Sequence, residues 1–273
     1  MRELAGRAAV VTGGGSGIGR GIALALAAEG VRVMVADIEE PAAARVAAEI
    51  VQRGGEAHAV RVDVTEQGSL DALREQTREL CGPVQLLSNN AGVILPLARM
   101  AEQTLADWEY VFSVNLFGIV KSVQTFLPEL VEQGEAHVVN TASLAGLVAI
   151  PSLPIGIYTA SKYACVGYTE MLRGELAGTG VSASVLCPGM VQTNLVATSA
   201  RNRPERFGGP DAESGEMELR PQMMAAEEVG PIVVRGIRED RLHILTHPQG
   251  RGQVEARFRA LLDDFDAAER AAG

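Results

Sequence analysis

Tyr158 and Lys162, four residues apart in the stretch YTASK, form the pair with the clearest catalytic potential. At that spacing two side chains lie on one face of a helix, which places the lysine ammonium beside the phenol. A nearby positive charge favours the phenolate, so the pair predicts a lowered pKa for Tyr158 and a role as general acid/base. The pair is a weak signal by itself, because this spacing occurs by chance in many helices.

A glycine-rich stretch, TGGGSGIG, occupies residues 12–19 between a predicted strand and a predicted helix. The dinucleotide pattern G-x-G-x-x-G does not fit it in any register, but Gly13, Gly17 and Gly19 follow a related spacing. In this context glycines let the backbone approach a pyrophosphate, and the helix N-terminus supplies free N–H groups. The alternative is a flexible turn without a ligand.

Asp37 ends the second predicted strand, eighteen residues after Gly19. A carboxylate there can accept hydrogen bonds from both ribose hydroxyls of an adenosine and would repel a 2′-phosphate, which predicts NAD rather than NADP. Ser16 and Ile38 offer no basic group to neutralise such a phosphate, and we expect Arg20 to lie along its helix in solvent. The alternative for Asp37 is a turn or cap residue.

Two further polar residues end predicted strands. Ser143 follows HVVNTA, where a hydroxyl could hydrogen-bond a substrate oxygen, since ligands bind at the carboxyl ends of parallel strands. Asp63, in VDVT, could accept from an adenine amino group. The alternatives are a helix cap for Ser143 and a strand-end cap for Asp63.

The elements that must position these groups alternate between strand and helix. Short apolar runs predict strands at 8–13, 31–37, 57–65, 84–92, 136–143, 181–189 and 242–247. Between them, helices are predicted at 17–30, 41–55, 68–82, 105–133 and 157–177. This alternation predicts one Rossmann-type α/β domain over residues 1–273, a doubly wound parallel sheet of about seven strands with helices on both faces.

Composition narrows the function classes. The formal net charge of −10 argues against a nucleic-acid partner. The three cysteines have neither paired nor metal-ligand spacing, so we expect no disulfide framework and no metal site. A strand that starts at about residue 7 leaves no room for a signal peptide, and the uncharged run 144–161 contains Pro151 and Pro154. We therefore expect a cytoplasmic protein without a membrane span.

Two C-terminal pieces stand apart. Residues 194–225 are polar and rich in glycine and proline, which is typical of a substrate lid or a mobile surface loop. A helix is predicted at about 251–270, and we expect its apolar face to pack on the protein's own core. The alternative is a subunit contact. That face consists of Val254, Phe258, Leu261, Leu262 and Phe265.

Taken together, the motifs resemble the classical short-chain dehydrogenase/reductase family over about residues 5–195, with a weaker similarity to 250. The matching motifs are TGGGSGIG (12–19), Asp37, DV (63–64), NNAG (89–92), VN (114–115), Ser143, YTASK (158–162) and PGMVQT (188–193). Each is modest alone, but eight in the family's order are specific. One departure is visible, because the segment from Ser143 to Tyr158 is slightly long and contains two prolines, which could reshape the substrate wall.

The resemblance implies catalytic roles for four residues. Tyr158 would be the general acid/base, and Lys162 would bind the nicotinamide ribose and lower the tyrosine pKa. Ser143 would orient the substrate oxygen, and Asn115, at a bend in its helix, would hold a water that relays protons. The implied cofactor contacts are Gly13, Ser16, Gly17, Ile18, Gly19, Asp37, Ile38, Asp63, Val64, Asn90, Ala91, Gly92, Tyr158, Lys162, Pro188, Gly189, Val191 and Thr193.

The implied reaction is hydride transfer between NAD and a secondary alcohol or its ketone, in a homodimer or homotetramer built on helices near 105–130 and 158–177. Alternatives are a non-redox enzyme on the same fold, such as a dehydratase or epimerase, and a non-catalytic NAD-binding regulatory protein. A bulky hydrophobic or aryl alcohol, steroid-like or lignin-derived for example, is expected from an apolar wall. That wall would include Leu147, Val148, Ile150, Leu153, Ile155, Met190, Leu195, Phe207, Met217, Met223 and Met224.

Overall fold

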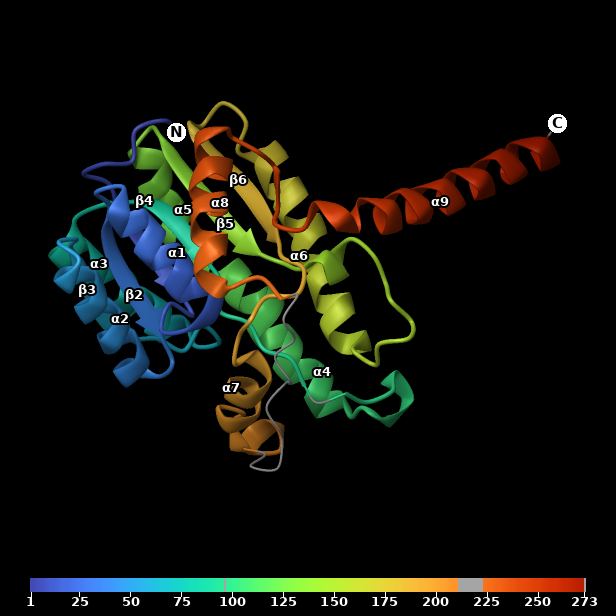
Figure 1. Ribbon diagram of the computed structural model, residues 1–273, viewed down its shortest axis with the longest axis horizontal. Helices are drawn as coiled ribbons and strands as arrows, with labels where there is room; N and C mark the ends of the chain where they lie inside the picture. The colour runs from blue at the N-terminus through green and yellow to red at the C-terminus, as the bar shows by residue number, and fades with distance from the viewer. Residues whose placement is uncertain (96, 211–222, 273) are drawn as a thin grey trace.

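A parallel sheet of seven strands runs through the centre of the computed structural model, which describes residues 1–95, 97–210 and 223–272 (Figure 1). The strand order is β3-β2-β1-β4-β5-β6-β7, and every neighbouring pair is parallel. The strands are β1 (Ala8–Thr12), β2 (Arg32–Asp37), β3 (Ala57–Arg61), β4 (Val84–Asn89), β5 (Ala136–Thr141), β6 (Val181–Cys187) and β7 (His243–Leu245). The predicted fold class is confirmed.

The chain direction across the sheet reverses between β1 and β4, and the crevice at such a reversal is where open α/β sheets bind ligands. The helices around the sheet within the described residues are α1 (Gly17–Ala28), α2 (Glu40–Gln52), α3 (Gln67–Cys81), α4 (Leu105–Phe112), α5 (Gly118–Glu132), α6 (Gly156–Glu175), α7 (Leu195–Arg201), α8 (Ala226–Arg238) and α9 (Arg251–Ala272).

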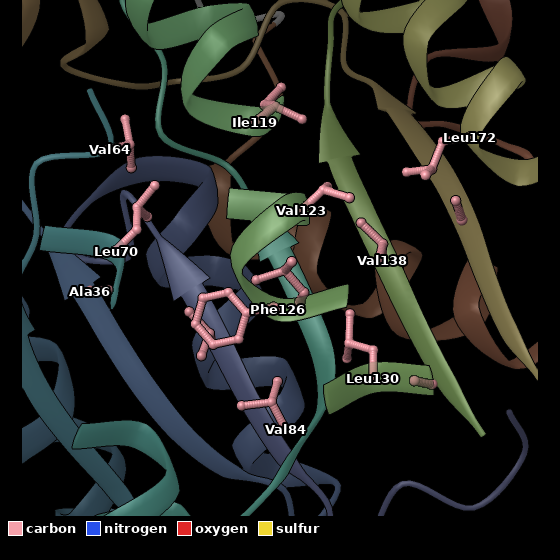
Figure 2. Close-up of a cluster of buried hydrophobic side chains, with 14 of the residues drawn as sticks. Ala36, Val64, Leu70, Val84, Ile119, Val123, Phe126, Leu130, Val138 and Leu172 are labelled. Carbon is pink, nitrogen blue, oxygen red and sulfur yellow. The ribbon is translucent and has the colours of Figure 1, made fainter. Parts of the chain in front are cut away.

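Helices bury both faces of the sheet, so the strands are apolar on both sides. On one face, α3, α5 and α6 pack around Phe126, which lies among Val84, Val123 and Leu130 in Figure 2. On the other face, α1, α2 and α8 form a second core with the alternate strand residues. The two cores fix the carboxyl ends of the strands, and these ends carry the pocket described below.

The predicted helix at 105–133 is interrupted by a π-helical turn at Ser113–Phe117, which joins α4 to α5. Asn115 lies in this turn, in agreement with the predicted bend. The whole stretch Leu105–Glu132 is apolar enough to cross a membrane by composition, but 56% of the window concerned is buried inside the protein. It is therefore a core element of this fold.

Two helices were not predicted, and α9 behaves differently from the prediction. The short α7 lies in a segment expected to have no regular structure, and α8 contains two glycines and a proline that obscure its helical pattern. Gly230 of α8 lies so close to α1 that a Cβ there would be 2.1 Å from the Gly21 carbonyl oxygen.

None of the residues of α9 is buried, so the expected packing on the protein's own core is wrong.

Candidate active site

A pocket of about 430 Å³ opens at the carboxyl ends of the strands. One end, the glycine-loop end, is lined by Gly13–Ile18, Asp37–Glu39 and Asp63, apart from Gly14. A second part of the same pocket, the lid end, is lined by Met190, by residues of the 194–204 segment and by Met223. Tyr158, Lys162 and Ser143 also line this pocket, so one cavity contains the predicted reactive groups and the glycine loop.

The glycine loop packs tightly against the segment after β4. Gly13 has a φ of 62°, and a Cβ there would lie 2.8 Å from Cα of Ala91. Gly19, predicted as a cofactor contact, is not part of the pocket wall. A Cβ on Gly19 would come within 2.0 Å of the Gly13 carbonyl oxygen, so its role is to let the turn close.

The start of α1 suits an anionic group. Gly17 and Ile18 begin the helix with no acidic residue in the first turn, and both line the pocket with Ser16. The N–H groups at a helix N-terminus lack intrahelical partners and carry a partial positive charge. The glycines leave this backbone accessible, so the residues present fit the pyrophosphate of a dinucleotide.

Asp37 occupies the wall at the end of β2 and is held by the loop itself. Its Oδ2 accepts a hydrogen bond from the Gly15 N–H at 2.8 Å, and its Oδ1 accepts from the Glu39 N–H at 3.0 Å. Burial raises the pKa of Asp37, while these backbone donors oppose the rise. A carboxylate oxygen with one partner retains a lone pair for a ligand hydroxyl. Ile38 lines the pocket beside it.

Sequence reasoning missed two charged residues near Asp37. Glu39 and Arg45 both line the pocket, although the prediction counted no basic group there. Burial alone would raise the pKa of Glu39, but hydrogen bonds from Arg201 and Asn202 outweigh it and lower the pKa. The charge of Arg45 contributes to that lowering. Arg20, expected in solvent, instead pairs with Glu49 and Glu227 away from the pocket.

The segments after β3 and β4 complete the glycine-loop end. Asp63 lines the pocket with Val64, but its Oδ1 accepts from the Thr65 N–H and hydroxyl at 2.9 and 2.7 Å, so it also caps a turn. Asn90 lines the pocket with Ala91 and Gly92, and its Nδ2 donates to the Gly13 carbonyl at 3.2 Å. Asn90 therefore has a structural role in addition to any ligand contact.

The predicted reactive group is assembled from α6 and the end of β5. The Lys162 Nζ lies 5.5 Å from the centroid of the Tyr158 ring and donates to the Thr141 carbonyl at 2.9 Å. The Ser143 hydroxyl accepts from the Ala145 N–H at 3.1 Å and faces the same pocket. Ser143 therefore caps a short helical turn and also lines the pocket, while its predicted contact with a substrate oxygen stays a prediction.

The predicted lowering of the tyrosine pKa is wrong for this structure. Burial raises the pKa of Tyr158 to about 12, and a hydrogen bond with Ser143 only partly opposes the rise. Burial also lowers the pKa of Lys162. The physical reason is that burial disfavours the charged form of both groups.

Asn115 does not line the pocket. Its Oδ1 accepts from the Val93 N–H at 2.8 Å, and its Nδ2 donates to the Val93 carbonyl at 2.9 Å and to the Ser161 hydroxyl at 3.0 Å. The side chain is fully buried and holds the strand-end segment beside α6. Its predicted role in holding a water stays a prediction.

The PGMVQT segment forms the wall between the two ends through Pro188, Gly189, Val191 and Thr193. The Gly189 N–H donates to Nδ1 of His247 at 3.1 Å. A Cβ on Gly189 would lie 2.6 Å from Cγ of the same histidine. His247 was not predicted as a site residue, and it supports this wall from the end of β7.

The lid end is built differently from the prediction. Instead of an irregular loop, residues 194–209 contain α7 and a short 3-10 turn at Glu205–Phe207, while residues 211–222 lie outside the described part of the chain. Of the predicted apolar wall, Met190, Leu195 and Met223 line the pocket, and Met217 lies outside the described residues. The residues placed elsewhere are Leu147, Val148, Ile150, Leu153, Ile155, Phe207 and Met224.

The α7 segment, residues 194–209, is attached by buried residues, among them Ser199 and Phe207, and by three ion pairs. Ser199 is 1% exposed, and it accepts from the Ile94 N–H and the Tyr110 hydroxyl, each at 3.0 Å. The ion pairs are Arg201–Glu39 at 2.5 Å, Arg203–Asp107 at 2.6 Å and Arg206–Glu66 at 3.1 Å. Tyr110, Ile94 and Val114 add apolar wall that sequence reasoning missed.

No group of three or more His, Cys, Asp or Glu side chains in the described part of the chain could hold a metal ion. The glycine-loop end of the pocket fits a dinucleotide, and its lid end includes the apolar residues Met190, Leu195 and Met223.

A family model described as "short chain dehydrogenase" matches residues 7–204. A CLA biosynthesis dehydrogenase/reductase from Lactiplantibacillus plantarum is 33% identical, over 97% of this chain and 96% of that protein. A 1-deoxy-11-beta-hydroxypentalenate dehydrogenase from Streptomyces exfoliatus is 34% identical, over 92% and 87%. The crystal structure of a short-chain dehydrogenase/reductase from Burkholderia phymatum in complex with NAD is 36% identical, covers 97% of each chain and has a TM-score of 0.88.

Proposed function

Because the chain belongs to the short-chain dehydrogenase/reductase family, an alcohol/ketone oxidoreductase family that binds nicotinamide cofactors, we propose that it interconverts a secondary alcohol and its ketone with NAD. The observation that carries the proposal is the shared pocket, in which Tyr158, Lys162 and Ser143 meet the glycine loop. The substrate would occupy the lid end, because the cofactor would fill the glycine-loop end and the lid end supplies the rest of the same pocket wall.

The chain's own residues would hold the cofactor and move the proton. The backbone at 13–18 would hold the pyrophosphate, Asp37 the adenosine ribose, and Lys162 the nicotinamide ribose. When bound, the nicotinamide supplies or accepts a hydride. Tyr158 would donate a proton to the ketone oxygen or take one from the alcohol, and Ser143 would orient that oxygen. A phenol whose burial raises its pKa to about 12 is protonated at neutral pH, so it is ready to act as the acid.

The first test is the Tyr158→Phe variant. We expect its turnover with any accepted alcohol to fall by roughly 10²–10⁴-fold, because the hydroxyl that moves the proton is gone. Binding of NADH, followed by its fluorescence, should change little. The matched control is Tyr163→Phe on the same helix, since Tyr163 packs under Arg257 outside the pocket. Full activity of Tyr158→Phe would overturn the assigned role.

The preference for NAD over NADP is supported by two carboxylates, Asp37 and Glu39, in the wall where a 2′-phosphate would lie. Arg45 and Arg201 also line the pocket and argue the other way, but Arg201 pairs with Glu39 and the charge of Arg45 is partly offset by the same carboxylate. In Asp37→Asn, we expect the ratio of kcat/KM for NAD to that for NADP to fall at least tenfold, because one repulsive charge is removed. A wild-type preference for NADP would contradict this part of the proposal.

The substrate class is proposed from the apolar lid end, where Tyr110, Met190, Leu195 and Met223 form the wall. We propose a bulky hydrophobic or aryl alcohol, which agrees with a relative named as a hydroxypentalenate dehydrogenase. A panel of bulky and small secondary alcohols, with the absorbance of the NADH formed as the signal, tests this directly. Product formation without net change in NADH would favour a dehydratase or epimerase, and tight NADH binding without turnover would favour a regulatory protein.

The proposal also includes a cytoplasmic location and a homodimer or homotetramer. All three cysteines are free and buried, which is consistent with a reducing compartment. Members of this family commonly form oligomers, and exposed apolar residues such as Phe117 and Met171 lie on the helices expected to mediate contacts. The partners proposed are small molecules and further copies of the chain, with neither nucleic acid nor membrane.

A further inference from the structure

The last helix, α9, leaves the body of the protein and carries the C-terminus away from it (Figure 1). Its start is fixed against α6, where the Arg257 guanidinium lies 5.2 Å from the Tyr163 ring centroid. A helix of 22 residues spans about 33 Å, and none of its residues is buried. Most helical stability in proteins comes from packing of an apolar face, which α9 lacks within its own chain.

The apolar stripe of α9 is continuous and exposed. Phe258, Leu261, Leu262 and Phe265 are 50, 46, 62 and 62% exposed, and with Val254 they fall on one side of the helix. Scattered surface apolar residues are normal, whereas a contiguous stripe marks an interaction surface. The stripe is centred on Leu261 and Leu262, the middle of the helix.

The charges of α9 are segregated along its length. The first half holds Arg251, Arg257 and Arg259 against one acid, Glu255. The second half holds four acids against one base, Arg270. The four acids are Asp263, Asp264, Asp266 and Glu269. The helix dipole favours acids near the N-terminus and bases near the C-terminus, so this order does not stabilise an isolated helix.

We propose that α9 pairs with α9 of a second copy of this chain, antiparallel, across a twofold axis near its midpoint. An antiparallel pair places the basic half of each helix on the acidic half of its partner and buries both stripes. The two helix dipoles are then also antiparallel, which is favourable. A parallel pair would instead place like charges together. The twofold axis makes the interface self-complementary, as in most soluble homodimers.

The same features argue against a lipid surface as the occupant. Interfacial helices typically carry lysine and arginine along their polar face, because most membrane surfaces are anionic. The acidic half of α9 would be repelled there. The segregated charges, by contrast, are explained fully by a second copy.

The test measures the assembly state of the full-length protein by sedimentation velocity over a range of concentrations. In Leu262→Asp, we expect one association step to be lost, with its dissociation constant raised at least tenfold. The matched control is Ala260→Asp, which adds the same charge on the opposite side of the same helix and should assemble as wild type. Because α9 contributes nothing to the core, dissociation should leave the body of the protein folded, so NADH binding followed by fluorescence should be the same for all three proteins.

Orientation is tested by charge reversal. Arg259 and Asp266 lie two turns apart on one flank of the stripe. A twofold axis between residues 262 and 263 would place Arg259 of one copy opposite Asp266 of the second copy, and the reverse. Arg259→Asp and Asp266→Arg alone should each weaken assembly, and the chain with both changes should regain it. Unchanged assembly in Leu262→Asp, or failure of the double reversal to restore assembly, overturns the proposal. Flotation of the wild type, but not Leu262→Asp, with phosphatidylcholine/phosphatidylglycerol vesicles would overturn it in favour of a lipid surface.

Discussion

The glycine-loop end of the pocket depends on close backbone contacts, whereas the lid end is held in place by side-chain contacts. Gly13 and Gly19 bring two backbone segments so close that a single added carbon at Gly19 would lie 2.0 Å from an oxygen. The α7 segment at the other end is fixed by Ser199 and by arginines that pair with acids on three other elements. The glycine-loop end depends on glycines, which have no side-chain atoms to block the contact. The lid end depends on long side chains, which can be replaced by others.

This difference sets how each end responds to substitution. Atoms cannot be added to a close-packed backbone contact without moving the backbone, which typically costs about 1–3 kcal/mol or more. An exposed ion pair contributes only about 0–1 kcal/mol. We therefore expect the glycine-loop end to tolerate little change, while the lid end can alter its substrate with little effect on the fold.

The largest effect is expected at the glycine-loop end. In Gly19→Ala the new Cβ would meet the Gly13 carbonyl and the Asn90 side chain, so the turn must open. We expect the free energy of unfolding to fall by roughly 3 kcal/mol and NADH binding to be lost. The measurements are urea unfolding and NADH fluorescence.

Gly167→Ala is the matched control for this variant. Gly167 lies within α6 with no atom within 4 Å of an added Cβ, so alanine there should raise stability by up to about 1 kcal/mol. If Gly19→Ala unfolds and binds NADH as the wild type does, the rigid description of the glycine-loop end is wrong.

An intermediate effect is expected at the lid end, from Arg203→Ala. The arginine pairs with Asp107, donates to the Phe207 carbonyl at 2.7 Å and stacks on Tyr110, and both partners of the ion pair are only 16% exposed. We expect KM for the alcohol to rise about tenfold, equivalent to about 1.4 kcal/mol, with kcat and KM for NAD little changed. Steady-state kinetics with each substrate varied in turn measures this split.

Arg206→Ala supplies the comparison for Arg203. Arg206 pairs with Glu66, but the two side chains are 52 and 55% exposed, so we expect less than a twofold change in KM. Equal effects of the two substitutions would show that burial of the ion pair does not decide how the lid end is held.

The two ends also differ in how far the sequence predicts them. The glycine-loop end can be predicted from short sequence motifs, because a close backbone contact restricts the residue type. Only glycine fits at positions such as Gly13 and Gly19. Short motifs at strand ends and on one helix likewise predicted Asp37, Tyr158, Lys162 and Ser143, which share one pocket, and the apolar runs predicted the seven strands.

The lid end leaves no comparable signal in the sequence. Its apolar wall includes Tyr110, Ile94 and Val114, which are distant in sequence, and Phe207 packs on Tyr110 instead of facing the pocket. Arg203 finds Asp107 across 96 residues, a pairing that no local pattern encodes. The pKa of Tyr158 was misjudged for a related reason, because burial depends on the whole fold whereas the Tyr–Lys spacing is local.

An effect smaller than that of Arg203→Ala is expected at Glu39, where the two ends meet. This residue lines the pocket beside Asp37, and its carboxylate accepts from Arg201 and Asn202 of the α7 segment at 2.5 and 2.7 Å. These hydrogen bonds lower the pKa of Glu39 from its ordinary 4.5, so the contact stabilises the fold above that value and is lost as the pH falls through the lowered pKa. Glu39→Gln keeps an acceptor but removes the charge, and should weaken the contact by about 0.5–1 kcal/mol.

Whether the two ends act together is decided by which constants Glu39→Gln changes: KM for NAD, KM for the alcohol, or both. If Glu39 couples them, Glu39→Gln should raise KM for both NAD and the alcohol by two- to fivefold at pH 7, and the wild type should approach the variant as the pH falls below 4.5. Glu40→Gln, one residue further on at the start of α2, is the control and should leave both constants unchanged. A rise in KM for NAD alone would mean that the α7 segment binds the alcohol independently of the glycine-loop end. In that case substrate preference could change without altering cofactor binding.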